Sequence, residues 1–342
     1  MFATVLPGLT GIAGRELGSL GGIRVTGEGS DGRSGVLLLE ADRGCRQQLR
    51  SVPTIEDLFA EVGRARWADG DRPDRIASRV WVPERVQRAL SVWAEEAGPL
   101  TAAMTFRVIA RVRTETSFLR TDLRRELTRA IAAGKPKWSV ADPARLEVWI
   151  TEYAPGCLVA GIRLSDASMR QHRGRAAERP GALRPTMAAA MVGLAGPARP
   201  PGGRLLDPCC GSGTILAEAL AAGWAAEGRD IDPSAVDISR RNVPDAAILA
   251  GDARRLDLPA ASVGACVSNL PFGQQYGVPG EREPWLAAVL AELARVTRPA
   301  GRIVLLAPQL PGRAVPAELS LRERHPVRLL GTRTAIWAYE RG

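Results

Sequence analysis

The sequence predicts an α/β protein in which a mostly parallel sheet follows two smaller α+β units. From Pro185 onward, strand-length apolar runs alternate with helical patterns, which is typical of a parallel sheet covered by helices on both faces. The last two apolar runs, 326–331 and 334–341, lie too close together for a crossover helix, so they predict an antiparallel hairpin at one edge. Residues 1–65 show strand–helix–strand–strand–helix order, as in a small ferredoxin-like unit.

The individual elements follow from periodicity and from turn residues. In the first unit, residues 1–65, we expect strands at 2–6, 23–27 and 35–41 and helices at 11–20 and 43–52. In the second, residues 66–165, we expect helices at 83–98 and 119–134 and strands at 105–113, 144–153 and 157–165. From 185 to 342 we expect helices at 185–196, 214–223, 234–242 and 284–297, and strands at 204–208, 225–231, 246–252, 262–269 and 302–308.

Residues 166–184 are polar and rich in Arg, Gly and Ala, which predicts a connector between domains. Two interpretations of this connector stay open. It is a solvated linker, or it is a basic strap along an RNA backbone. The strap would use Arg170, Arg173, Arg175 and Arg179.

The composition favours a polyanionic partner. The chain of 342 residues has a formal net charge of +9 and a pI of about 10.1, and cationic side chains that neutralise phosphates release counterions. A GC-rich genome is an alternative source of this arginine content, because Lys135 and Lys137 are the only lysines among the 46 basic residues. The excess of basic over acidic residues nevertheless favours nucleic acid.

Other features argue against secreted and membrane proteins. No apolar run approaches membrane-spanning length, and the N-terminal segment lacks the basic start of a signal peptide. The five cysteines show no metal-ligand spacing and are too sparse for a disulfide framework. We therefore expect a cytoplasmic protein with reduced thiols, no metal site and no membrane association.

The stretch DPCCGSGT, residues 207–214, predicts a ligand-binding turn between a strand and a helix. Gly211 and Gly213 allow a ligand to approach the backbone, and the helix after them offers oriented N–H groups. Leu216 stands where a dinucleotide motif has its third glycine. This difference argues against NAD and is compatible with another adenosine cofactor. The same stretch contains the consecutive residues Cys209 and Cys210. Small side chains that pack a tight loop explain them better than a redox pair does.

Acidic residues follow the next two strands. Asp230, followed by Ile231, has a spacing from Asp207 that suits an acid holding ribose hydroxyls. Asp252 could accept from an adenine amino group, and the Ala253 backbone could meet the ring edge. Asp207 itself discriminates between cofactors: its charge is favourable beside the sulfonium of S-adenosylmethionine and repulsive beside a pyrophosphate.

The stretch NLPF ends the fourth strand, beside the same predicted site. The exocyclic amine of a nucleobase is a poor nucleophile, and acceptors on its N–H groups would aim its lone pair at a methyl group. The Asn269 side chain and a backbone carbonyl near Pro271 could accept these bonds, and Phe272 offers a face for base stacking. Positioning and electrostatics then supply most of the rate without a strong base.

The motifs DPCCGSGT, GRDID, GDAR and NLPFG resemble those of class I S-adenosylmethionine-dependent methyltransferases that modify exocyclic amines. The chain is most similar to the THUMP-domain RNA methyltransferases, which make N2-methylguanosine in tRNA. The resemblance implies a Rossmann-like domain with a mostly parallel seven-stranded sheet over 185–342, preceded by a ferredoxin-like domain (1–65) and a THUMP-like RNA-binding domain (66–165). It also implies that the N-terminal half holds the tRNA acceptor end.

Carried over residue by residue, the resemblance implies a complete site. The cofactor would be held by Asp207, Cys209, Gly211, Gly213, Asp230, Ile231, Asp252 and Ala253, and the target base by Asn269, Pro271 and Phe272. Leu270 departs from the second residue of the general motif, and Gln274 and Gln275 stand where a basic residue is often found. N6-methylation of adenine and a non-catalytic RNA-binding factor with a vestigial cofactor site stay open as alternatives.

Overall fold

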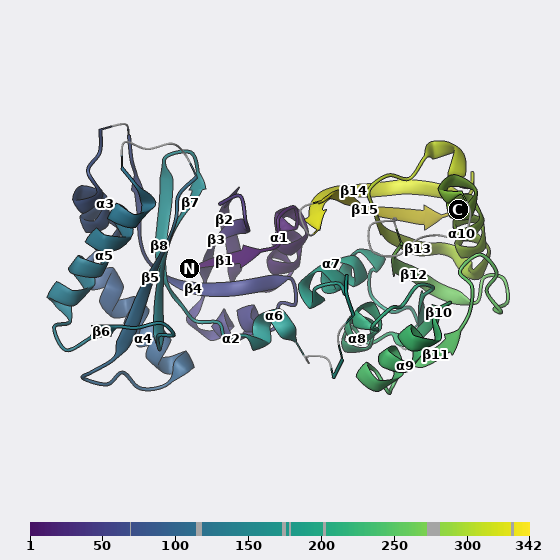
Figure 1. Ribbon diagram of the computed structural model, residues 1–342, viewed down its shortest axis with the longest axis horizontal. Coiled ribbons are helices and arrows are strands. Elements are labelled where there is room, and N and C mark those ends of the chain that lie inside the picture. Colours follow the sequence, from purple (N-terminus) through teal and green to yellow (C-terminus); the bar gives the residue numbers. More distant parts are fainter. Residues whose placement is uncertain are drawn as a thin grey trace. The chain divides into compact units, whose positions relative to one another are not determined.

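The computed structural model describes residues 1–68, 70–113, 118–172, 176–177, 179–200, 203–271, 281–329 and 332–342. These residues form two compact units, Met1–Arg170 and Gln171–Gly342, each with its own sheet (Figure 1). The boundary falls inside the predicted connector, so part of the connector belongs to each unit.

The first unit has eight strands in the order β2-β3-β1-β4-β8-β7-β5-β6. The strands are β1 (Phe2–Val5), β2 (Ile23–Ser30), β3 (Gly35–Ala41), β4 (Ile55–Arg66), β5 (Thr105–Arg111), β6 (Ser139–Val140), β7 (Leu146–Ala154) and β8 (Cys157–Arg163). The helices are α1 (Thr10–Gly18), α2 (Arg46–Arg50), α3 (Pro73–Val80), α4 (Pro83–Ala97), α5 (Arg120–Gly134) and α6 (Ser168–Gln171), with a 3₁₀ turn η1 at Arg43–Cys45.

Strand β4 makes this sheet continuous. Its first half pairs antiparallel with β1 and its second half with β8, so one sheet runs through both of the α+β units that the sequence predicts. Phe2 on β1 stacks on Phe59 of β4 with ring centroids 4.4 Å apart, and Trp149 of β7 packs against the same ring. The aromatic contact therefore joins strands from both predicted units in one core.

No strand is predicted at β4 from the sequence, because acids interrupt its apolar pattern. Glu56 and Asp57 are nevertheless buried, at 7% and 2% exposure. Gly63 is required by close packing, since a Cβ there would lie 2.2 Å from the carbonyl oxygen of Val80. A strand whose charges are paired inside the protein does not show the alternation of apolar and polar residues on which a prediction depends.

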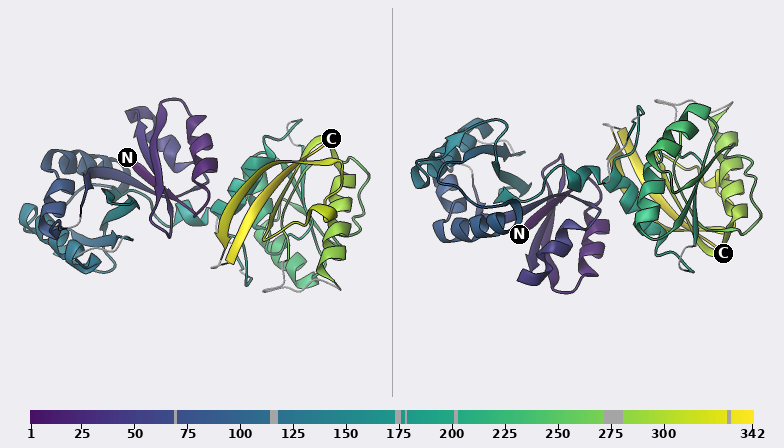
Figure 2. Two further views of the ribbon diagram at one scale, coloured as in Figure 1. Left: turned by 90° about the horizontal axis from the view of Figure 1, so that it is seen from above. Right: turned by 90° about the horizontal axis from the view of Figure 1, so that it is seen from below.

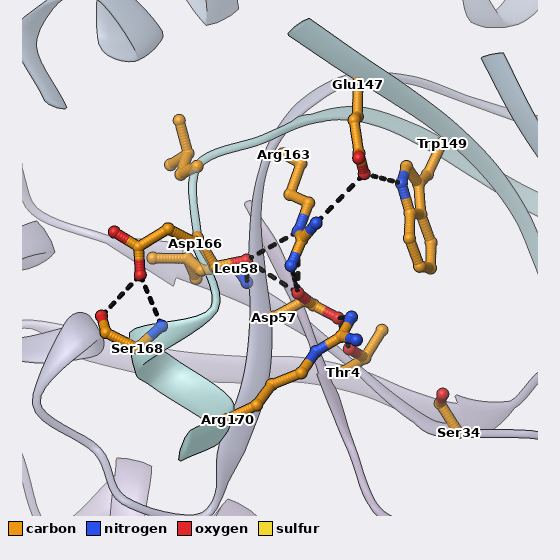
Figure 3. Close-up of polar contacts among 12 residues, drawn as sticks. Thr4, Ser34, Asp57, Leu58, Glu147, Trp149, Arg163, Asp166, Ser168 and Arg170 are labelled. Atoms are coloured by element: carbon orange, nitrogen blue, oxygen red, sulfur yellow. Dashed lines mark hydrogen bonds and ion pairs between the residues drawn. The ribbon is translucent and has the colours of Figure 1, made fainter. Parts of the chain in front are cut away.

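The pairing of Asp57 is the first step of a ladder of charges across β4, β8, β7 and β5, and Figure 3 shows the part of it from Asp57 through Arg163 to Glu147. Arg163 Nε donates to Asp57 Oδ1 at 2.8 Å, and Arg163 also contacts Glu147 Oε2 at 3.2 Å. Glu147 in turn accepts from Arg107 Nε at 3.0 Å, and Arg170 forms an ion pair with the second oxygen of Asp57. Buried charges are tolerated here because each one has a hydrogen-bonded partner of opposite sign.

The second unit has seven strands in the order β11-β10-β9-β12-β13-β15-β14. The strands are β9 (Arg204–Asp207), β10 (Ala225–Asp230), β11 (Ala247–Ala250), β12 (Val263–Asn269), β13 (Thr297–Ala307), β14 (Leu319–Leu329) and β15 (Thr332–Arg341). The helices are α7 (Pro185–Ala195), α8 (Thr214–Ala221), α9 (Pro233–Asn242) and α10 (Arg282–Val296), with a 3₁₀ turn η2 at Gly312–Ala314.

The sheet is mixed. Strands β9 to β13 are parallel to one another, whereas β15 runs antiparallel to both β13 and β14 at one edge. Helices α7 and α8 lie on one face and α10 on the other (Figure 2). Because both faces are covered, the inner strands are buried almost throughout, and the first six residues of β12 are all buried. The edge strand β14 exposes Arg322 and Arg324 instead, which discourages pairing with another chain.

We expect Asp57→Asn to lower the free energy of unfolding of the first unit by about 3–5 kcal/mol, because it removes a buried carboxylate that two half-buried guanidinium groups share. Urea unfolding of the full chain, followed by tryptophan fluorescence, measures this loss. The matched control is Asp142→Asn, since Asp142 pairs with Arg107 at the solvent end of the ladder and its side chain is 75% exposed. Equal losses in the two variants would contradict a stabilising role for the buried end.

Candidate functional site

The carboxyl ends of four parallel strands lie side by side along one edge of the second sheet, the edge that runs across the strands. In spatial order these strands are β11, β10, β9 and β12, and the polar residues at or just after their ends are Asp252, Asp230, Asp207 and Asn269. The chain places β10 and β11 on one side of β9 and β12 on the other, and ligands of open α/β sheets bind at such a switch point. The four polar residues that sequence reasoning selected therefore lie along one edge.

Asp207 occupies the centre of this edge and is almost fully buried, with 1% of its surface exposed. Its Oδ1 accepts hydrogen bonds from Ser268 Oγ at 2.7 Å and from the Cys209 backbone N–H at 3.1 Å. Burial raises the pKa of Asp207 to about 7, while these two hydrogen bonds act in the opposite direction and the charge of Asp230 adds to the rise. A carboxyl group with this pKa changes its charge in the physiological range.

The turn after Asp207 depends on its glycines. Gly211 and Gly213 have φ angles of 54° and 84°, in the left-handed region that side chains disfavour. A Cβ at Gly213 would lie 2.6 Å from Ser239 Oγ, whereas one at Gly211 would have no neighbour within 4 Å. Gly213 is thus required by packing against α9, and Gly211 borders open space in the described structure.

Leu216 occupies the position at which a dinucleotide motif has its third glycine. It is fully buried, and its Cδ1 lies so close to Gly228 of β10 that a Cβ there would come within 2.6 Å. The glycine that permits close packing of helix and strand is therefore on β10 and not on α8. Burial also raises the pKa of both Cys209 and Cys210, which keeps the two thiols neutral and supports a packing role.

Asp230 is tied to the loops on both sides of it. Its Oδ2 accepts from the Gly211 N–H at 2.9 Å and its Oδ1 from the Asp232 N–H at 3.0 Å. Each carboxylate oxygen can accept a second hydrogen bond, so the group can still bind a ligand. The next residue, Ile231, exposes 62% of its surface, which is unusual for a large apolar side chain.

Asp252 has a different environment from the one expected. Its carboxylate accepts from the Arg254 backbone N–H at 2.9 Å and pairs with the Arg254 guanidinium at 2.6 Å. These hydrogen bonds, above all the one from the guanidinium, lower the pKa of Asp252. Ala253 beside it is 5% exposed. A ligand amine at Asp252 would share the carboxylate with Arg254.

Asn269 carries an unusual buried atom. Its side-chain Oδ1 is shielded from solvent and has no hydrogen-bond partner in the described part of the chain. A buried acceptor without a partner costs free energy, and such atoms occur at functional sites. Pro271 follows on the same segment, and Phe272, Gln274 and Gln275 lie outside the described residues. Leu270, the departure from the general motif, is 2% exposed and belongs to the core cluster under α10.

The four arginines of the predicted strap are not equivalent. Arg170 is paired with Asp57 of the first unit, and Arg179 NH2 lies 2.6 Å from Asp232 Oδ2 at the start of α9. Arg173 and Arg175 lie outside the described residues. Two of the four therefore serve internal ion pairs, and the strap interpretation now depends on the other two.

Several residues near this edge were not selected from the sequence. Ser268, which donates to Asp207, had only its position one residue before Asn269 as a signal. His172, within the predicted connector, has Nδ1 at 2.7 Å from Glu218 Oε1. Asn242 donates to the backbone of the glycine turn. Contacts of this kind join segments far apart in the chain, so no local pattern shows them.

Within the described ranges, no group of three or more His, Cys, Asp or Glu side chains is arranged to hold a metal ion. No helix in the same part of the chain combines the length and apolarity needed to cross a bilayer.

Known proteins resemble this chain in sequence. The family model described as "UPF0020: RMKL-like, methyltransferase domain" matches residues 172–313. A tRNA (guanine(6)-N2)-methyltransferase of Thermus thermophilus is 30% identical over 278 residues, which cover 75% of this chain and 77% of that enzyme. A tRNA (guanine(10)-N2)-dimethyltransferase of Methanothermobacter thermautotrophicus is 32% identical over 165 residues, which cover 46% of this chain. The chain spans 48% of that archaeal enzyme's length.

A solved structure shares the fold over the whole chain. The crystal structure of TrmN from Thermus thermophilus matches with a TM-score of 0.78 at 24% identity, covering 100% of this chain and 99% of that one. A match of this kind establishes the arrangement of elements, and the chemistry must be argued from the site itself.

We expect the difference in unfolding free energy between the wild type and Asp207→Asn to depend on pH. Because the folded-state pKa of Asp207, about 7, lies above its ordinary 3.8, the protonated carboxyl stabilises the fold fully below pH 3.8, and this contribution is lost as the pH rises through 7. Between pH 3.8 and 7 the wild type should therefore lose stability relative to the variant by up to about 1.4 kcal/mol per pH unit. Above pH 7 the difference between the two proteins should stay constant. Denaturant unfolding without added ligand measures the difference, and a constant value from pH 4 to 8 would contradict the assignment.

Proposed function

We propose that this chain transfers a methyl group from S-adenosylmethionine to the exocyclic N2 amine of a guanosine in tRNA. The chain belongs to the family of tRNA guanine-N2 methyltransferases. The observation that carries the proposal is the buried, unpartnered Oδ1 of Asn269 at the switch point of the sheet. An exocyclic amine has two N–H donors, so it would satisfy this acceptor.

The residues present fit S-adenosylmethionine. Gly211 borders open space at the turn, Asp230 has acceptor capacity for ribose hydroxyls, and Ile231 presents an exposed apolar surface for an adenine ring. Asp207 would lie near the sulfonium and amino groups, where a negative charge is favourable. When bound, this cofactor would supply an electrophilic methyl group.

The chain's own residues would prepare the amine. Asn269 Oδ1 would accept one N–H, and a carbonyl of the Leu270–Pro271 segment would accept the other. Both bonds would aim the nitrogen lone pair at the methyl group, and Pro271 brings no competing donor. We assign Phe272 to stacking on the base, from the sequence alone. The proton released from the amine passes to water, so the site needs no strong general base.

The N-terminal unit would hold the RNA. We assign residues 1–65 to a ferredoxin-like domain and 66–165 to a THUMP-like RNA-binding domain that contacts the acceptor stem. Residues 166–184 connect them to the catalytic domain, 185–342. The net charge of +9 supports a polyanionic partner. So do Arg120 and Arg124 of α5, which are exposed and have no acidic partner among the described residues. Such a substrate would place the protein in the cytoplasm.

We expect Asn269→Ala to lose methyl transfer to tRNA by at least about 100-fold, because the amine would lose the acceptor that orients it. Binding of S-adenosylhomocysteine should stay within about threefold of the wild type, since Asn269 would touch the base and not the cofactor. Single-turnover transfer of a labelled methyl group and isothermal titration measure the two quantities. Full activity in this variant would remove Asn269 from the mechanism.

We also expect the preference for S-adenosylmethionine over S-adenosylhomocysteine to grow as the pH rises from 6 to 8. Only the former carries a sulfonium charge, and ionised Asp207 would attract it, whereas the protonated group present below its pKa of about 7 would not. Titration of both ligands across this range gives the preference as a ratio, the dissociation constant of S-adenosylhomocysteine divided by that of S-adenosylmethionine. Asp207→Asn is the control and should show a smaller ratio that does not vary with pH. A ratio that is unaffected by this substitution would place the sulfonium elsewhere.

A further inference from the structure

The side chain of Asn242, the last residue of α9, joins two segments that are far apart in the sequence. Its Nδ2 group donates to the Ser212 carbonyl at 2.9 Å and to the Ala177 carbonyl at 2.9 Å. Its Oδ1 accepts from the Ala177 N–H at 3.0 Å. Both N–H groups and the oxygen are therefore used, and Ala177 is bonded through both of its backbone groups, as it would be beside a neighbouring strand.

One of these bonds holds the glycine turn of the candidate site. Ser212 lies between Gly211 and Gly213, whose left-handed conformations take the turn out of any regular hydrogen-bonding pattern. Its carbonyl therefore needs a partner from outside the turn. The C-terminal part of α9 also packs on Gly213, since a Cβ there would lie 2.6 Å from Ser239 Oγ and 2.9 Å from Val243 Cγ2. The end of α9 thus supports the turn by packing and by the hydrogen bond from Asn242.

The other two bonds hold the connector. On either side of Ala177, connector residues contact the same group of elements: His172 lies 2.7 Å from Glu218 of α8, and Arg179 lies 2.6 Å from Asp232 at the start of α9. Helices α8 and α9 are those that follow the glycine turn and Asp230. Three described residues of the connector, His172, Ala177 and Arg179, therefore contact the helices that follow the candidate cofactor turn and Asp230.

We propose that Asn242 is a positioning residue for the cofactor, which fixes the glycine turn by bonding Ser212 to Ala177 of the connector. The inference rests on the proposed function, because it assigns the turn to S-adenosylmethionine. Asn242 acts through the backbone of the turn. Its loss should therefore weaken cofactor binding and leave the methyl-transfer step almost unchanged.

The test compares Asn242→Ala and Asn242→Asp with the wild type, using S-adenosylhomocysteine as the binding probe. Loss of the hydrogen bond to Ser212 of the turn should raise the dissociation constant and the KM for S-adenosylmethionine about tenfold, with kcat at saturating cofactor within about twofold. Asn242→Asp should raise both constants as well, because it keeps the acceptor for the Ala177 N–H and loses the donors to the Ser212 and Ala177 carbonyls. Arg241→Ala is the matched control, since Arg241 is exposed and bonds only within its helix, to the Asp237 carbonyl, among the contacts described.

Hydrogen exchange separates positioning from a purely structural role. In Asn242→Ala the Ala177 amide should exchange faster, whereas in Asn242→Asp it should stay protected. A lower melting temperature with an unchanged dissociation constant would overturn the proposal, and so would a lower kcat with an unchanged KM. Absence of guanosine methylation by a wild type that binds S-adenosylhomocysteine would contradict the proposed function, while the binding comparison would still decide the role of Asn242.

Discussion

The parallel pairing of β9 with β10 on one side and β12 on the other is the constraint on which the candidate site depends. It places the ends of these strands at one edge, and it puts the carboxyl group of Asp207 between them, where water is excluded. That burial has a cost for a charged group, which Ser268 and the Cys209 N–H reduce without removing. An acid held in this way gains a favourable partner when a cation binds beside it, and the unpartnered oxygen of Asn269 gains one when a donor does. Under the proposed function, the free-energy cost that both groups carry without a ligand would favour binding of a cation and an amine at these strand ends.

The N-terminal unit also buries carboxylate groups, but it pairs them differently. Its carboxylates are buried with partners already supplied by the protein, in the ladder that runs from Arg170 through Asp57 and Arg163 to Glu147. This ladder crosses β4, the strand that makes the eight-stranded sheet continuous. Charges that are fully paired stabilise a scaffold and leave no acceptor for a ligand. The contrast between paired acids in one unit and partly satisfied groups in the other separates scaffold from site on physical grounds.

The sequence contains enough information to predict the second unit, because its strands are apolar and its polar residues stand directly after them. The strand ends at Asp207, Asp230 and Asn269 agree with the predicted runs for this reason. Strand β4 escapes prediction because its acids are satisfied by residues such as Arg163, more than a hundred positions away. The roles of Arg170, Arg179 and Asn242 escape it for the same reason, since composition makes 166–184 look like a linker. Non-local partners decide these cases, and a single sequence does not show them.

The central claim is that the buried oxygen of Asn269 receives an exocyclic amine of guanine. Its most direct test is mass spectrometry of the nucleosides from tRNA that has been incubated with the 342-residue chain and S-adenosylmethionine carrying an isotopically labelled methyl group. The account predicts label in N2-methylguanosine. Label in N6-methyladenosine instead, or no label in any nucleoside, would contradict it.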